Sequence, residues 1–183
     1  MNNRKVYISG EIVPEVDAKI SIFDSAVLLG DTVTESTRTF NFKPFKLDEH
    51  LERLYKSFKL TRINPQMTIE EMKKVSLELL EINKDNYKAN EDCWLVHNIS
   101  RGHSITGGNP ALQVSKPTVM IYTQPMNLVL WAPFYTKGCH AVTPPTRMVP
   151  SQSLDARIKN RSRLFYTLAE IEAKLVDPDA QSV

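Results

Sequence analysis

The sequence predicts an α+β fold, in which a small α/β sandwich domain is followed by the beginning of a second, larger α/β domain. Three observations lead to this class. Segments rich in β-branched and aromatic residues stand at both ends of the first 125 residues, and two amphipathic helical patterns lie between them. A third helical pattern follows near the C-terminus, after a segment bracketed by prolines.

Short strands are expected throughout the chain before the first helix. The stretch KVYISGEIV predicts two strands joined by a turn at Ser9-Gly10, because apolar residues alternate on both sides of a typical turn pair. KISIFD alternates again, and DTVTESTRTF, residues 31–40, is rich in β-branched residues. NFKPF then predicts a turn before another short strand. Together these strands predict a β-meander.

Two amphipathic helices are expected next. Residues 47–63 place apolar side chains at helical spacing, with Asp48 as the expected N-cap. Residues 68–84 repeat the pattern, and Thr68 and Glu71 have the spacing of a capping box. The apolar positions of the first helix are Leu47, Leu51, Leu54, Phe58 and Ile63.

The domain boundaries follow from this pattern. Two further strands, CWLVHNISRG and PTVMIYTQP, complete a small domain over residues 1–125. Residues 126–136 predict an interdomain linker, and residues 137–183 begin a large domain with a strand, a helix and the start of another strand. These do not close a domain, so we expect a truncated chain or a second domain supplied elsewhere. The expected helix carries one apolar stripe, formed by Leu164, Leu168, Ile171 and Leu175.

Composition limits the classes of function. The net charge of +2, from 23 basic and 21 acidic residues, gives no general attraction to nucleic acid or to an acidic membrane. Cys93 and Cys139 lie outside any C-x-x-C pair, so neither a metal site nor a disulfide framework is expected. The N-terminus turns polar too early for a secretory signal, and no run approaches the roughly 20 apolar residues of a membrane helix. We expect a soluble, cytoplasmic protein that acts on small molecules.

Lys159 is the first candidate for chemistry. It stands in SLDARIKNRSRL among Arg157, Arg161 and Arg163, just before the last helix. A lysine with its reference pKa of about 10.4 is protonated at neutral pH, but burial and neighbouring cations both favour the neutral amine. The neutral amine is the form that attacks a carbonyl to give a Schiff base. The residues alone leave two interpretations open, a nucleophilic lysine and a solvated basic face, and the second is the commoner for such clusters.

Arg53 is a candidate ligand for an anion. It lies in HLERL on the first helix, and His50, three residues earlier, shares its face. A guanidinium at the edge of a site can meet a phosphate with two parallel hydrogen bonds. The alternative is a surface ion pair with Glu49 or Glu52, and the residues by themselves favour that alternative.

The strand at residues 31–40 offers candidate pocket residues. The separation of Glu35 and Arg38 is odd, so an unbroken strand puts them on opposite faces. Arg38 shares its face with Thr34 and Ser36. This polar face either lines a pocket or forms the wet side of a half-exposed sheet, which is the commoner outcome.

Trp94, on a later strand, and His103, in the loop that follows it, have similar alternatives. Trp94 alternates with Val96 and Asn98 on CWLVHNI, so it either projects into a cleft or packs in the core. His103 follows Arg101-Gly102 in a loop that could contact a substrate, where it would be an acid or a base. A lone histidine in a loop is more often simply solvated.

Two segments of the chain together resemble a known family. GDTVTESTRTFNFKPFKLDEHLERLYKS resembles the N-terminal signature of class IV, fold-type IV pyridoxal-phosphate enzymes, approximately G-D-x-V-[FY]-E-x-x-[RK], a turn, and F-x-L-x-x-H-[LI]-x-R-L. SQSLDARIKNRSRLFYTLAEIEA is similar to the second landmark, in which the Schiff-base lysine precedes a helix. The family includes branched-chain and D-amino-acid aminotransferases, (R)-selective amine transaminases and aminodeoxychorismate lyases. The resemblance covers essentially the whole chain.

The resemblance implies a role for each matched residue. Lys159 would bind pyridoxal 5'-phosphate as a Schiff base and then carry the α-proton, and Arg53 would bind the cofactor phosphate. Arg38 would lie near the substrate carboxylate, with Thr34 and Trp94 as further wall residues. A homodimer, in which small-domain loops close the neighbour's pocket, is implied in the same way.

Departures from the family pattern bear on the substrate. Thr34 stands where Phe or Tyr is usual, and Leu29 replaces a Tyr or His. Thr106 and Gly108 fall where D-amino-acid aminotransferases carry an Arg and a His that hold the carboxylate, so a D-amino-acid preference is disfavoured. The glutamate that pairs with the pyridine nitrogen and the T-G-[IL]-T-R-like phosphate cradle do not occur in the 183 residues.

The expected function is pyridoxal-phosphate-dependent transamination between an amino acid or amine and a 2-oxo acid, of the branched-chain or (R)-amine type. One alternative is the chemistry of aminodeoxychorismate lyase, which uses the same lysine to eliminate pyruvate. Another is a catalytically incomplete binding or assembly module, because the 183 residues alone lack the acidic partner and most of the phosphate cradle.

Overall fold

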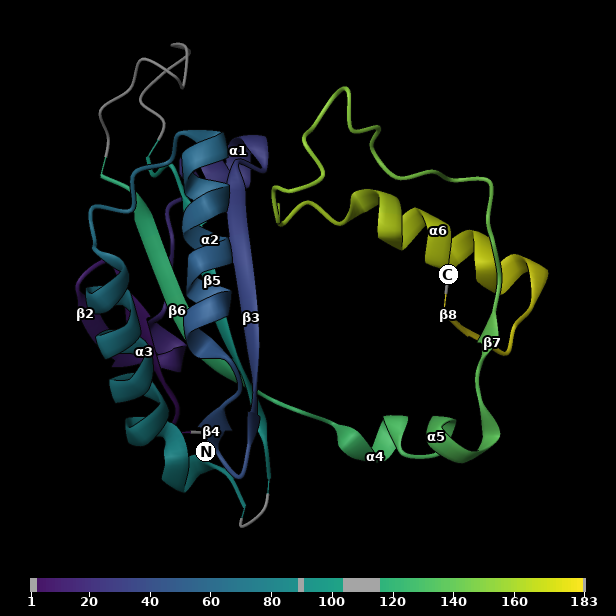
Figure 1. The fold of residues 1–183 in the computed structure, drawn as a ribbon, viewed down its shortest axis with the longest axis horizontal. Coiled ribbons are helices and arrows are strands. Elements are labelled where there is room, and N and C mark those ends of the chain that lie inside the picture. The colour runs from purple at the N-terminus through teal and green to yellow at the C-terminus, as the bar shows by residue number, and fades with distance from the viewer. Residues whose placement is uncertain (1–2, 89–90, 104–115, 183) are drawn as a thin grey trace. The chain divides into compact units, whose positions relative to one another are not determined.

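The structure, a computed structural model, describes residues 3–88, 91–103 and 116–182. The chain divides into two compact units (Figure 1). The first comprises Met1–Met126 together with Arg157–Arg161, and the second comprises Asn127–Ala156 together with Ser162–Val183. The segment that carries Lys159 therefore belongs to the first unit.

The first unit is built on a six-stranded antiparallel sheet. Its strands are β1 (Lys5–Ile8), β2 (Glu11–Pro14), β3 (Thr32–Phe40), β4 (Lys43–Pro44), β5 (Cys93–Ser100) and β6 (Thr118–Pro125). They lie in the order β2-β1-β6-β5-β3-β4. This antiparallel sheet with its helices confirms the predicted α+β class, and the turn predicted at Ser9-Gly10 joins β1 to β2.

The predicted β-meander has the wrong strand order. β1 pairs with β2 and then with β6, so β5 and β6 separate the first hairpin from β3. KISIFD is not a strand either, because residues 18–23 form none and Asp24 makes only an isolated bridge to His103. Asp24 instead caps the short helix α1 (Ser25–Leu29), where its carboxylate accepts the Ala26 N–H at 2.8 Å. Capping chemistry therefore overrides the alternating pattern.

Two helices cover one face of this sheet (Figure 1). α2 (Leu47–Thr61) packs on β3, and α3 (Ile69–Asn83) packs on β1 and β6. The predicted capping box is confirmed, since Thr68 Oγ1 accepts the Glu71 N–H and the Glu71 carboxylate accepts the Thr68 N–H. The apolar residues predicted for the first helix are all buried, namely Leu47, Leu51, Leu54, Phe58 and Ile63.

The prediction that Asp48 caps α2 is wrong. The helix begins at Leu47, and the preceding residue, Lys46, has a left-handed conformation with φ of 54° and makes no side-chain cap. Asp48 lies inside the first turn, where a carboxylate is favourable near the positive end of the helix dipole. There it pairs with Lys73 of α3, whose Nζ lies 2.7 Å from Asp48 Oδ1.

The second unit contains short elements and one longer helix. They are α4 (Leu128–Trp131), α5 (Phe134–Lys137), β7 (His140–Ala141), α6 (Leu164–Val176) and β8 (Ala180–Ser182). β7 and β8 pair in parallel. α6 confirms the predicted helix and buries Ala169 and Ala173, whereas the side chains of its predicted apolar stripe are between 47% and 81% exposed. Two single turns complete the described structure, η1 (Glu15–Asp17) and η2 (Lys84–Asn86).

Candidate active site

The segment that carries Lys159 lies along an edge of β3. The Thr34 N–H donates to the Lys159 carbonyl at 2.9 Å, and the Arg161 N–H donates to the Thr32 carbonyl at 2.9 Å. β4 pairs only with the far end of β3, so the near end keeps an edge at which a further segment can pair. Residues far apart in the sequence thus join one sheet, and Lys159 is held there through its backbone carbonyl.

α2 holds the same segment from a second direction. The Lys159 N–H donates to Ser57 Oγ at 3.3 Å, and the Ser57 hydroxyl donates to the Arg53 carbonyl at 3.2 Å. Ser57 is fully buried, Lys159 is half-buried, and Ile158 packs against the apolar core of the first unit. The backbone of Lys159 is therefore fixed at both its N–H and its carbonyl.

Arg53 is anchored by a buried carboxylate on β3. Its Nε and Nη2 each donate to Glu35 at 2.7 Å, and His50 Nδ1 lies 3.1 Å from Glu35 Oε1. The Glu35 side chain is fully buried, whereas that of Arg53 is 52% exposed. The ion pair with Glu49 or Glu52 does not form, because each of these pairs with a lysine instead.

The electrostatics of this pair keep both partners charged. Burial would raise the pKa of Glu35, but hydrogen bonds from Arg53 and from the Ser36 N–H outweigh it and hold that pKa below its usual range. The hydrogen bond to Glu35 raises the pKa of Arg53. Nη1 of Arg53 makes no hydrogen bond within the described part of the chain, so the guanidinium keeps donors for a second anion.

Arg38 lies further along β3, on the face of the sheet that alternation turns away from Glu35 and α2. It stands opposite Trp94 in the register of β3 and β5, and its guanidinium lies 3.8 Å from the centre of the Phe40 ring. Arg38 lies four positions along the strand from Thr34, a distance of about 13 Å. Arg38 therefore lies beside Trp94, further along β3 than Thr34, whose N–H holds the Lys159 carbonyl.

A pocket of about 310 Å³ opens in the first unit. Its lining residues are Ser36, Trp94, Val96, Gln124 and Arg161. Thr34, a predicted wall residue, is only 1% exposed, and its hydroxyl donates to the His97 carbonyl at 3.0 Å. Thr34 therefore meets the Lys159 segment through its backbone, while Trp94 contributes its side chain to the pocket.

Comparison with known proteins shows the family of this chain. Residues 32–181 match the family model described as amino-transferase class IV. This chain is a class IV aminotransferase family member. It is 35% identical over 175 residues to a putative branched-chain-amino-acid aminotransferase of Methanocaldococcus jannaschii, covering 96% of this chain and 57% of that protein. It is 33% identical over 177 residues to branched-chain-amino-acid aminotransferase-like protein 2 of Arabidopsis thaliana, covering 94% and 30%.

Solved structures show the same fold. The branched-chain aminotransferase of the thermophilic archaeon Thermoproteus uzoniensis, solved with norvaline, superposes with a TM-score of 0.74 at 23% identity, over 95% of this chain and 57% of that one. The Escherichia coli branched-chain enzyme gives a TM-score of 0.76 at 22% identity, over 96% and 56%. The class IV aminotransferase chain thus spans less than two thirds of the length of these relatives.

Sequence reasoning missed two residues that organise this candidate site. Strand alternation places Glu35 only on a face of its strand and does not indicate that it is the partner of Arg53. Ser57 stands four residues after Arg53, and this spacing puts the two on one helix face. Its contact with Lys159, however, spans 102 positions, and no local pattern signals a contact of that range.

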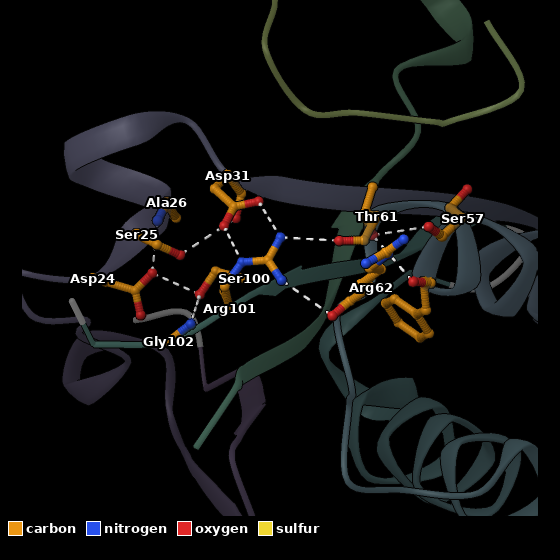
Figure 2. A network of polar contacts seen from close by, with 11 residues as sticks. Asp24, Ser25, Ala26, Asp31, Ser57, Thr61, Arg62, Ser100, Arg101 and Gly102 are labelled. Atoms are coloured by element: carbon orange, nitrogen blue, oxygen red, sulfur yellow. Dashed lines mark hydrogen bonds and ion pairs between the residues drawn. The ribbon is translucent and has the colours of Figure 1, made fainter. Parts of the chain in front are cut away.

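Arg101, placed by sequence in a possible substrate loop, has structural partners in this aminotransferase chain. Figure 2 shows its guanidinium between Asp31 and the last turn of α2. Nε donates to Asp31 at 2.8 Å, Nη2 to the Thr61 carbonyl at 3.0 Å, and Nη1 to the Arg62 carbonyl at 3.1 Å. A cation at a helix C-terminus is favourable, so Arg101 fastens the end of α2 to the segment before β3.

The start of the following loop is tied to the same region (Figure 2). Ser100 Oγ donates to Asp24 at 2.6 Å, and the Gly102 carbonyl accepts the Ser25 N–H at 2.9 Å. Gly102 has φ of +95°, and a Cβ there would collide with the Lys116 carbonyl oxygen. His103 is exposed and contacts the ring of Phe23. Thr106 and Gly108, which bear on D-amino-acid preference, lie outside the described residues.

The described residues also bear on metals and membranes. They include no group of three or more His, Cys, Asp or Glu side chains placed to hold a metal ion. Over the same residues, no helix is both long enough and apolar enough to span a bilayer.

Proposed function

We propose that this chain carries the cofactor lysine and the phosphate-binding arginine of a pyridoxal-phosphate-dependent aminotransferase. In this proposal the parent reaction transfers an amino group between a branched-chain amino acid, or an (R)-amine, and a 2-oxo acid. The observation that carries the proposal is that the same two elements, β3 and α2, hold both groups. Glu35 of β3 orients Arg53, while Thr34 of β3 and Ser57 of α2 hold Lys159.

The residues present fit this cofactor. Pyridoxal phosphate supplies an aldehyde that condenses with an amine and a ring that stabilises negative charge at the substrate α-carbon. The half-exposed Arg53 keeps unused donors at Nη1, which suits a phosphate. The Ser57 hydroxyl links the backbone of Lys159 to the helix turn of Arg53, so both side chains start from neighbouring backbone positions, as one cofactor molecule bound by both would require.

Each residue then has one task. Arg53 binds the phosphate in a fixed orientation, because its bidentate pair with Glu35 prevents rotation of the guanidinium. Lys159 would hold the cofactor through its side-chain amine and, once released from it, would move the proton at the substrate α-carbon. Trp94 and Val96 give the pocket an apolar wall that suits a branched aliphatic side chain, and Arg161 supplies a cation for a carboxylate.

The relatives support the branched-chain alternative over the others. The names of the Methanocaldococcus jannaschii and Arabidopsis thaliana proteins refer to branched-chain amino acids, and these matches cover nearly the whole of this chain. The match to a Staphylococcus epidermidis D-alanine aminotransferase, 32% identical, covers 66% of this chain. The homodimer and the cytoplasmic location stay predictions.

Covalent fixation of the cofactor tests this proposal. Purified chain is incubated with pyridoxal phosphate, reduced with borohydride and digested for peptide mapping. We expect the fixed cofactor at Lys159 and none in Lys159→Ala. The matched control is Lys56→Ala, which removes an exposed lysine of α2 and should leave the fixation unchanged.

A second comparison isolates the role of Arg53. Arg53→Gln should weaken the binding of pyridoxal phosphate about 10- to 100-fold, the range expected when a charge-assisted pair of hydrogen bonds is lost. Binding of pyridoxal, which has no phosphate, should be nearly the same in both proteins. Equal labelling of Lys56 and Lys159 would contradict the proposal and favour a binding or assembly module. Pyruvate release from aminodeoxychorismate without an oxo-acid acceptor would favour the lyase.

A further inference from the structure

The Ser57 hydroxyl contacts both the Arg53 turn of α2 and the Lys159 backbone. We propose that Ser57 is a positioning residue, which holds Lys159 in register against Arg53. This inference rests on the proposed function of those two residues. Ser57 does not touch the reacting atoms in this proposal. It acts by fixing where the lysine enters the site.

The hydrogen bonds of Ser57 use its hydroxyl in two directions. Its single proton goes to the Arg53 carbonyl, 3.2 Å away and four residues earlier in α2. A lone pair of the same oxygen then accepts the Lys159 N–H at 3.3 Å. Ser57 is fully buried, so solvent does not compete for either bond. One buried oxygen therefore joins the helix turn of Arg53 to the lysine.

Register along β3 explains why such a contact is needed. The two hydrogen bonds between β3 and the segment involve only backbone atoms, which are the same for every residue. A shift of the segment by two residues would remake both bonds with Arg157 or Arg161 in the place of Lys159, and a shift by one would turn Lys159 to the other face. Ser57 fixes the segment from outside the sheet, and the buried contact of Ile158 fixes it from the core.

Removing the hydroxyl has a defined consequence. In Ser57→Ala the Lys159 N–H loses its acceptor, while both hydrogen bonds to β3 remain. The segment should then open more often, and Lys159 should spend less time in the register that meets the cofactor. Amide exchange in residues 157–161 should accelerate about tenfold, the order expected for one unsatisfied buried donor.

A matched control exists on the neighbouring helix. Ser76 of α3 is also fully buried, and its hydroxyl also donates to the carbonyl four residues earlier, that of Met72 at 2.7 Å. Its other contact is His97 Nε2 at 2.8 Å and not the Lys159 segment. Ser76→Ala therefore removes the same chemical group at the same burial without touching the lysine.

The experiment compares hydrogen exchange in the cofactor-free chain with the rate of borohydride-trapped fixation at saturating pyridoxal phosphate. We expect Ser57→Ala to accelerate exchange at 157–161 about tenfold more than in β5, and to slow fixation by a similar factor. In Ser76→Ala, amide exchange in residues 157–161 should accelerate no more than amide exchange in β5. Binding of inorganic phosphate, which needs Arg53 but not Lys159, should change less than about threefold.

Two outcomes separate this inference from the proposed function. An exchange profile of Ser57→Ala that matches Ser76→Ala would overturn the role of Ser57, whatever the cofactor does. Fixation that fails at Lys159 in the unaltered chain would overturn the proposed function, and the exchange data would still decide whether Ser57 holds the segment. If Ser57→Ala does not fold, Ser57→Cys keeps the shape with a weaker acceptor and should give the same pattern with smaller changes.

Discussion

The helices α2 and α6 follow the same kind of amphipathic pattern, and their surroundings differ. In α2, Leu51 and Leu54 are fully buried against the six-stranded sheet. In α6, Leu168 is 47% exposed and Leu175 is 81% exposed, because this helix buries only small residues within its unit. An apolar stripe predicts a helix and shows which of its faces packs against another layer. It does not predict whether the described chain supplies the layer that covers that side.

Polar groups differ between the two units in the same way. The first unit buries ionisable side chains completely, as with Glu35 and His97. In the second unit the ion pair of His140 with Asp177 has side chains that are 63% and 33% exposed. Buried ionisable groups make stability depend on pH, whereas exposed pairs contribute little. The first unit should therefore respond to core truncation and to acid much more than the second.

The largest expected effect is that of Leu54→Ala in the first unit. Removing this fully buried side chain should lower the free energy of unfolding by about 2–5 kcal/mol, because a cavity remains beneath α2. Each unit contains one tryptophan, so in a Trp131→Phe background the fluorescence of Trp94 reports on the first unit during urea unfolding. A loss under about 1 kcal/mol would mean that α2 is not packed as described.

A smaller effect is expected from His97 and acid. Burial lowers the pKa of His97 to about 4, below the usual value of about 6.5. As the pH falls from about 6.5 to about 4, His97 therefore becomes protonated in the unfolded chain while it stays neutral in the folded chain. The free energy of unfolding should drop by about 3 kcal/mol between pH 6.5 and 4, and it should be independent of this group above that window.

Substitution separates this effect from other acid effects. His97→Gln should flatten the dependence of the first unit's unfolding free energy on pH between 6.5 and 4.5, whatever it costs at pH 7. His140→Gln, which changes an exposed histidine of the second unit, should leave that slope intact. Slopes that are equal in the unaltered chain and in His97→Gln would show that His97 titrates normally.

The smallest effect is expected for Leu168→Ala on α6. Its side chain is about half exposed, so truncation should change the free energy of unfolding of the second unit by less than about 0.5 kcal/mol. The fluorescence of Trp131 in a Trp94→Phe background measures it. A cost as large as that of Leu54→Ala would break the comparison, because it would show that the stripe is covered in solution.

Local chemistry made part of the fold predictable from the sequence. Thr68 and Glu71 form a capping box because their spacing alone places each side chain on the other's N–H. The odd separation of Glu35 and Arg38 put them on opposite faces because strand alternation needs no information from elsewhere. Asp48 is not the cap because the N-cap is Lys46, two residues earlier, whose left-handed backbone conformation is not signalled by its side chain.

The rest of the site could not be predicted because it depends on contacts between distant segments. The order of the strands depends on which strand edges pair when the chain folds. The alternation in KISIFD predicts a strand and does not indicate that Asp24 caps a helix instead. Lys159 and Arg53 were assigned by resemblance to a family. Their partners, Ser57 and Glu35, follow only from the packing of α2 on β3.

The segment that carries Lys159 also covers the backbone edge of β3, where Thr32 offers a carbonyl and Thr34 offers an N–H. An uncovered edge of this kind is a template on which another molecule can add a strand, and such additions lead to aggregates. Docking of the Lys159 segment and shielding of this edge from self-association are therefore a single event. A newly made chain remains open to unwanted pairing until its residues near position 160 have emerged and docked.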